Sequence, residues 1–265
     1  VSVQDYNAKD ASADQNGTPT KGSLNEWNVN LDETQTSKDF PGYYKSDDCQ
    51  DDLAWAAAWL SLASTKSNDT TAAAVYDDDC ETHLGNIKHD WGGYNWNSVK
   101  YGAALVNAAY LNGNWASVQK LITDYYDHNY YESISEWGCS RYNAGVQTIA
   151  LIAAKHKQEN SAAIDIDVNQ AIQWSQKQMD FILGGNRFNT CFVTGFAENS
   201  VKRPHFRAGS GQVFDMQVKD DTTVIDSYDD TNILLGGLVG GPKGDGNYED
   251  KRSDYMLNEV ASDYN

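Results

Sequence analysis

Three pairs of alanine-rich or amphipathic segments constrain this 265-residue chain more than any other feature. The first pair joins "DDLAWAAAWLSLAS" to "TTAAAVYDDDCETHL" through the short polar break "TKSND". Alanine has the highest helix propensity, and aspartate is favoured in the first turn of a helix. The two segments therefore predict a helical hairpin.

The same design recurs twice further along the chain. "SVKYGAALVNAAYL" is followed by "NWASVQKLITDYY", and "RYNAGVQTIALIAAKHK" is followed by "DVNQAIQWSQKQMDFIL". In the third pair, apolar residues such as Val146, Ile149 and Ala153 fall at helical spacing and predict a buried face. Three helical hairpins predict an all-α fold.

The remaining segments carry weaker helix signals. Residues 1–39 are polar, have no apolar periodicity longer than a turn, and predict a mostly loop segment ahead of a domain at 40–265. From Gly184 to about Asn247, Gly, Asp and Pro interrupt the chain, and a final short helix is predicted to run through Glu259. Long irregular segments in compact domains are usually either functional or disordered.

The charge of the chain excludes several classes of partner. A formal net charge of -18 repels phosphate backbones and anionic lipid, so we expect no nucleic acid and no membrane surface as partners. The sequence has neither an apolar run of roughly 18 residues nor the basic start and apolar core of a signal peptide. An exported form is therefore expected to be a processed chain.

Four cysteines without CxxC spacing favour either disulfides outside the cell or inert buried thiols. Cys49 precedes the first predicted helix and Cys80 ends its antiparallel partner, so hairpin geometry predicts a Cys49–Cys80 disulfide. Cys139 and Cys191 form the remaining pair. The alternative is four buried thiols.

Six stretches, taken together, resemble glycoside hydrolase family nine, the inverting endo-β-1,4-glucanases. They are "DDLAWAAAWL", "WGCSRYNA", "SQKQMDFILGGN", "CFVTGFAENSVKRPHFR", "LLGGLVGGP" and "YEDKRSDYMLNEVASDYN", in the family's order over roughly residues 40–265. The resemblance implies an (α/α)6 barrel of six helical hairpins, with a substrate cleft built by loops at one end. Three hairpins correspond to a partial barrel, the C-terminal part of the catalytic domain.

Inverting glycosidases use two carboxyl groups roughly 6.5 to 9.5 Å apart, one as acid and one as base. The resemblance makes Glu259 of "NEVASDYN" the general acid and Asp250 of "YEDKR" a nearby carboxylate that helps to hold it protonated. The family's base lies in a "DAGD"-like segment, which this sequence lacks, because "DASAD" at Asp10–Asp14 has the wrong spacing. We therefore expect the base in a missing N-terminal portion.

A half ring of hairpins would leave apolar helix faces open to water at its two edges, beyond the few hundred Å² that a soluble monomer tolerates. We expect a companion N-terminal segment or neighbouring copies of the chain to cover these faces.

The resemblance also implies contacts with a β-glucan. His205 and Arg207 of "RPHFR" match family residues that hydrogen-bond sugar hydroxyls, the alternative being a surface basic pair. Trp137, Trp91 and Tyr264 match cleft aromatics on which glucose rings stack. For Trp91 and Tyr264 a core role is the alternative.

Many family members bind calcium where "DDCQDDL" lies, although the reaction itself requires no cofactor. Asp47, Asp48, Asp51 and Asp52 offer the oxygen ligands that calcium takes, and Asn97 is a possible remote ligand. The alternative is a helix N-terminus enriched in Asp for its dipole.

The sequence thus predicts an extracellular endo-acting β-1,4-glucanase that is incomplete as this chain alone. Two alternatives stay open. One is a non-catalytic derivative that binds glucan or assembles with itself, and the other is the same chemistry acting as an exo-glucanase or on another glucan.

Overall fold

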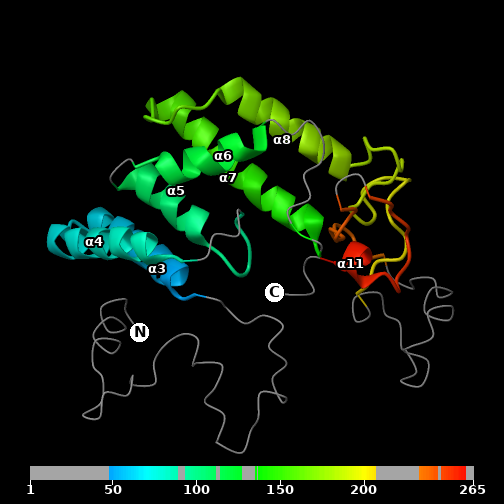
Figure 1. Ribbon diagram of the computed structural model, residues 1–265, viewed down its shortest axis with the longest axis horizontal. Helices are drawn as coiled ribbons and strands as arrows, with labels where there is room; N and C mark the ends of the chain where they lie inside the picture. Colours follow the sequence, from blue (N-terminus) through cyan, green and yellow to red (C-terminus); the bar gives the residue numbers. More distant parts are fainter. Residues whose placement is uncertain are drawn as a thin grey trace, which may run out of the picture. The chain divides into compact units, whose positions relative to one another are not determined.

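The computed structural model describes residues 48–88, 93–111, 114–126, 135, 137–206, 233–243 and 246–260. These residues form helices and irregular segments, without a strand longer than an isolated bridge (Figure 1). The helices are α3 (Gln50–Lys66), α4 (Thr70–Asn86), α5 (Lys100–Tyr110), α6 (Ala116–Tyr126), α7 (Cys139–Asn160), α8 (Val168–Ile182) and α11 (Tyr255–Asn258). All six helices of the three predicted hairpins are present, and the all-α prediction is confirmed.

The described residues divide into two compact units, one holding residues up to 120 together with 159–164 and the other holding the rest. The predicted loop segment at 1–39 lies outside the described residues. No helix in the described part of the chain is both long and apolar enough to cross a membrane.

In the first unit, α3 packs against α4 and α5 through small side chains. Ala57, Ala58, Cys80 and Val106 form its buried cluster. Alanine at these positions lets the helix backbones approach closely, which is why an alanine-rich sequence forms this hairpin. The turn into α4 is fixed by Asp69, whose carboxylate accepts a hydrogen bond from the Ala72 amide at 3.0 Å.

The two predicted disulfides are not formed, and all four cysteines are buried thiols. Cys80 packs among small apolar side chains, and burial raises the pKa of its thiol to about 12. The thiols of Cys139 and Cys191 instead donate to the backbone carbonyls of Ser135 and Val193, at 2.6 and 3.5 Å. The prediction from hairpin geometry was wrong, since closeness to one end of a helix pair does not bring two sulfur atoms into bonding geometry.

In the second unit, α7 and α8 are joined by a buried amide network. Asn143 donates to Gln178 at 2.8 Å, and Gln147 donates to Asn143 at 2.6 Å. All three side chains are at most 4% exposed, so each amide needs these partners. The network fixes the register of the two helices.

The irregular segments after α8 are held together by isolated backbone bridges. Cys191 pairs with Ser200, Val193 with Leu238, Val239 with Val260, and His205 with Glu259. Beneath them lies an apolar core that contains Phe192, whose ring centre is 4.8 Å from that of Tyr248. Figure 1 shows α11 beside these segments. This part of the second unit supports the candidate site.

The predicted last helix is shorter than expected. It ends at Asn258, and Glu259 lies beyond it in extended backbone. Glu259 and Val260 pair with His205 and Val239, and this tertiary pairing overrides the local helix signal.

Two glycines on neighbouring helices offer a test of the first unit's packing. A Cβ atom on Gly102 would lie 2.5 Å from Trp55 and 2.7 Å from Tyr94, whereas one on Gly85 would meet no atom within 4 Å. Gly102→Ala should lower the free energy of unfolding by about 1–3 kcal/mol through overpacking. Gly85→Ala should raise it by about 0.4–1 kcal/mol by restricting the unfolded chain. Urea unfolding of both variants measures the difference, and equal effects would contradict the packing described.

Candidate active site

Glu259 is buried, and its backbone is fixed on both sides. Its side chain is 7% exposed, and its carbonyl accepts from the Gly240 amide at 2.9 Å. The His205 amide donates to the Asn258 carbonyl at 2.7 Å, and the Val260 amide donates back to His205 at 3.5 Å. The segments around Gly240 and His205, far apart in sequence, thus hold the backbone of Glu259 in one place.

Trp137 contacts the carboxyl group directly, because its indole Nε1 donates a hydrogen bond to Glu259 Oε2. Trp137 comes just before α7, and Gly138 between them has a φ of 66°, a conformation that favours glycine. The start of α7 is attached to the same frame, since the Ser140 amide donates to the Gly240 carbonyl at 2.8 Å. An indole N–H can only donate, so it holds this acceptor oxygen in place.

Arg141 lines the same small pocket as Glu259 and Trp137. Its guanidinium lies 4.8 Å from the Tyr142 ring centre and donates to the Tyr142 hydroxyl at 3.2 Å. Arg141 was not among the predicted site residues. Its place in "WGCSRY", in the first turn of α7 and close in sequence to Trp137, was the signal that could have identified it.

The backbone of His205 lies next to that of Glu259. The two residues pair in a parallel backbone bridge, and the His205 side chain is half-buried. A buried carboxyl and an indole therefore meet in the second unit, beside the backbone of His205.

Asp250 lies on the segment that leads into α11, and its carboxylate binds the backbone that leads into His205. One carboxylate oxygen accepts from the Lys202 amide at 2.7 Å, and the other accepts from the Arg203 amide at 2.9 Å. Its predicted influence on the proton of Glu259 stays a prediction. Arg207, Trp91 and Tyr264 lie outside the described residues, so their predicted sugar contacts stay predictions as well.

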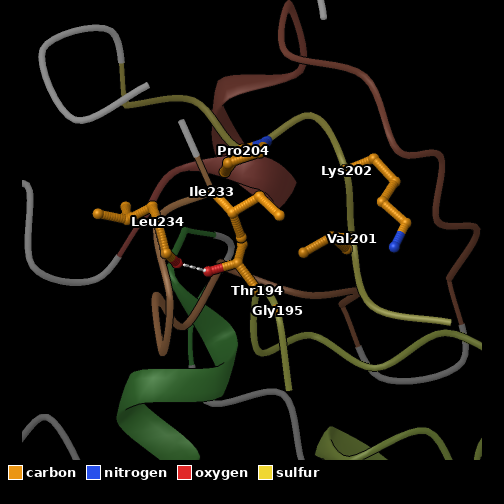
Figure 2. A pocket seen from close by; sticks show the side chains of 7 residues that line it. All are labelled: Thr194, Gly195, Val201, Lys202, Pro204, Ile233 and Leu234. Atoms are coloured by element: carbon orange, nitrogen blue, oxygen red, sulfur yellow. Dashed lines mark hydrogen bonds between the residues drawn. The ribbon is translucent and has the colours of Figure 1, made fainter. Parts of the chain in front are cut away.

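A second hollow, of about 290 Å³, lies beside the segment that leads into His205. Figure 2 shows its mostly apolar lining: Thr194, Gly195, Val201, Lys202, Pro204, Ile233 and Leu234. The Thr194 hydroxyl donates to the Leu234 carbonyl, so this polar group is engaged within the wall. No carboxyl group or histidine is among these lining residues, which distinguishes the hollow from the pocket beside Glu259.

The predicted calcium ligands are only partly brought together. Asp51 is 4% exposed, and one of its oxygens accepts from the Val99 amide at 2.8 Å, while Oδ1 is buried without a hydrogen-bond partner. Asp48 accepts from the Gln50 and Lys88 amides at 3.0 and 3.3 Å. Within the described ranges no three His, Cys, Asp or Glu side chains form a metal-binding group.

The charges around Asp51 nevertheless fit a cation. Partial burial, together with the charges of Asp51 and Asp48, raises the pKa of Asp52 to about 6. The Asn97 amide donates to Asn95 within a turn at 2.9 Å, and Asp47 lies outside the described residues. The calcium prediction therefore rests on the buried Oδ1 of Asp51, which accepts no hydrogen bond, and on the neighbouring Asp48 and Asp52.

The contact between Trp137 and Glu259 can be tested by a double-mutant cycle. Trp137→Phe removes the donor and should lower the free energy of unfolding by about 1–3 kcal/mol, because a buried acceptor then loses its partner. In the background of Glu259→Met, which has no acceptor, the same substitution should cost much less. Urea unfolding of the four proteins gives the coupling, and an equal cost in both backgrounds would rule out the contact.

The chain is similar to several known proteins. Residues 23–265 match the model of Glycosyl hydrolase family 9. The catalytic domain of CelT from Clostridium thermocellum is 30% identical with a TM-score of 0.66, over 89% of this chain and 50% of that one. Cel9M of C. cellulolyticum, solved in complex with cellobiose, is 27% identical with a TM-score of 0.65, over 84% and 49%. An endoglucanase of Dictyostelium discoideum is 26% identical over 82% of this chain and 29% of its own length.

The chain thus spans about half the length of the solved domains that it matches. These neighbours are (α/α)6-barrel cellulases, which confirms the predicted partial barrel of helical hairpins. By sequence and by fold, the chain belongs to glycosyl hydrolase family 9.

Proposed function

We propose that this chain supplies the general acid, Glu259, for the inverting hydrolysis of internal β-1,4-glucosidic bonds in cellulose-like glucans. The observation that carries the proposal is the buried Glu259 carboxyl, fixed by the bridge to His205 and by the Trp137 indole in a member of this family. Several similar proteins are endoglucanases, and Cel9M was solved with cellobiose. A neutral polysaccharide also suits a chain with a net charge of -18.

In this mechanism the protonated Glu259 gives its proton to the glycosidic oxygen while the bond from that oxygen to the anomeric carbon breaks. A carboxylate base takes a proton from water, whose oxygen bonds to the anomeric carbon from the opposite face. His205 would hydrogen-bond a sugar hydroxyl and the Trp137 ring would contact a sugar face, with Arg207, Trp91 and Tyr264 adding the contacts that the resemblance implies.

We further propose that the base comes from a companion N-terminal segment outside this sequence. The chain matches only about half of each solved relative, and the acid requires a second carboxyl at roughly 6.5 to 9.5 Å. Leu151 and Ile152 on α7 and Met179 on α8 are 38–41% exposed, which leaves apolar surface for such a segment to cover. Native mass spectrometry of active material should reveal this second segment, and an active assembly of this chain alone would contradict the proposal.

The hydrolase proposal is tested with soluble carboxymethylcellulose. Glu259→Gln removes the acidic proton and should lower the rate by about 10²- to 10⁴-fold, the usual contribution of general acid catalysis. Glu249→Gln is the matched control, because the Glu249 side chain is 63% exposed and pairs with Lys251. Release of reducing ends gives the rate, and an early fall in viscosity identifies endo action. Equal losses in both variants, or glucan binding without hydrolysis, would contradict it.

We also propose that the protein acts outside the cell. The predicted disulfides no longer support this location, but a polymeric glucan is too large to enter a cell before it is cut. Fractionation of the source cells should place the protein in the medium or at the cell surface, and recovery from the cytosol would contradict the proposal.

A structural calcium ion at Asp51 and Asp52 is a further part of the proposal. The ion would balance these charges at the start of α3, and the Asp51→Asn variant removes one charge while it keeps an acceptor for the Val99 amide. Calcium at 100 times its Kd should stabilise the wild type by about 2.7 kcal/mol. The gain should disappear in Asp51→Asn but persist in Asp69→Asn, a change at the N-cap of α4. Thermal unfolding after removal and return of calcium measures both, and equal gains would exclude this site.

A further inference from the structure

We infer that Asp250 is a positioning residue, which holds the Lys202–Pro204 backbone so that His205 and Glu259 pair. The inference rests on the proposed function in so far as it concerns catalysis. It differs from a role in which the charge of Asp250 acts directly on the proton of Glu259.

Backbone polar groups of residues 202–204, just before His205, form hydrogen bonds with side chains of residues 250–252. The two oxygens of Asp250 accept from the consecutive amides of Lys202 and Arg203, at 2.7 and 2.9 Å. Pro204 has no amide hydrogen, so the carbonyl is its one polar backbone group. That carbonyl accepts from Arg252 Nε at 3.4 Å, and the Arg252 side chain is 0% exposed.

The same segment is also attached to the other side of the bridge. The Asn258 side chain is 0% exposed, and its amide donates to the Glu249 carbonyl at 2.9 Å. The Tyr248 hydroxyl donates to Oδ1 of the same Asn258 side chain at 2.5 Å. Burial, followed by the charges of Asp250 and Asp254, raises the pKa of Tyr248, so the phenol keeps the proton that it donates.

Residues 248–252 therefore bind both partners of the backbone bridge. Asp250 and Arg252 hold the approach to His205, and Tyr248 and Glu249 hold Asn258, which immediately precedes Glu259. A carboxylate whose two oxygens accept from main-chain amides is well suited to fix a loop. Loss of either attachment should loosen the position of the acid relative to His205.

Hydrogen exchange tests the positioning role without any assay of hydrolysis. Asp250→Asn leaves one acceptor oxygen for two amides, and Asp250→Glu keeps the charge but displaces it by one methylene group. In both variants the peptides that cover 199–206 should exchange the Lys202, Arg203 and His205 amides about 10- to 100-fold faster than in wild type. Glu249→Gln removes a neighbouring exposed charge and should leave these amides unchanged. Unchanged exchange in Asp250→Asn would overturn the inference.

Kinetics separate positioning from a direct effect of charge. Positioning predicts that Asp250→Asn and Asp250→Glu both lower kcat, by up to about 100-fold, and leave the alkaline limb of the pH–rate profile in place. A charge effect predicts that Asp250→Asn moves this limb to lower pH, while Asp250→Glu stays close to wild type. The second pattern would overturn the inference. If wild type hydrolyses no glucan, the proposed function fails, and the exchange experiment alone decides the positioning role.

Discussion

The backbone pairing of His205 with Asn258 and Val260 is the interaction on which the rest of the site depends. Neither segment forms a helix or strand at this point, so a few N–H to carbonyl bonds determine where the Glu259 carboxyl lies. Gly240 joins this frame to the start of α7, and a Cβ atom there would lie 2.5 Å from the Met256 carbonyl oxygen. Only glycine allows so close an approach of the two backbones.

The surroundings of Glu259 show how an acidic chain can keep one carboxyl group distinct from many others. Carboxylates on an exposed protein surface need no partner, because water solvates them. Glu259 is 7% exposed and accepts a hydrogen bond from Trp137, while Arg141 lines the same pocket. Burial and specific donors, rather than the overall charge, give this residue its own chemistry. The apolar hollow beside Thr194 has no such group and serves as a contrast within the same unit.

The helices could be predicted from sequence because their signal is local. Alanine content and apolar spacing identified α3 to α8 to within a few residues. The end of α11 could not be predicted, since the pairing of Glu259 with His205 joins residues 54 positions apart. The same limit applies to the cysteines, whose carbonyl partners and packing depend on tertiary structure. The family motif identified Asp250 and Glu259, but their different attachments to the backbone emerge only in three dimensions.

Proton donation from Glu259 to the leaving oxygen is tested most directly by the rate of Glu259→Gln on substrates with different leaving groups. A dinitrophenyl β-cellobioside releases a weakly basic phenolate that needs no proton, whereas a glucan releases a basic alkoxide that does. We predict that Glu259→Gln hydrolyses the activated cellobioside at close to the wild-type rate and the glucan at least about 100-fold more slowly than wild type. An equal loss on both substrates would contradict the assignment of Glu259 as the acid.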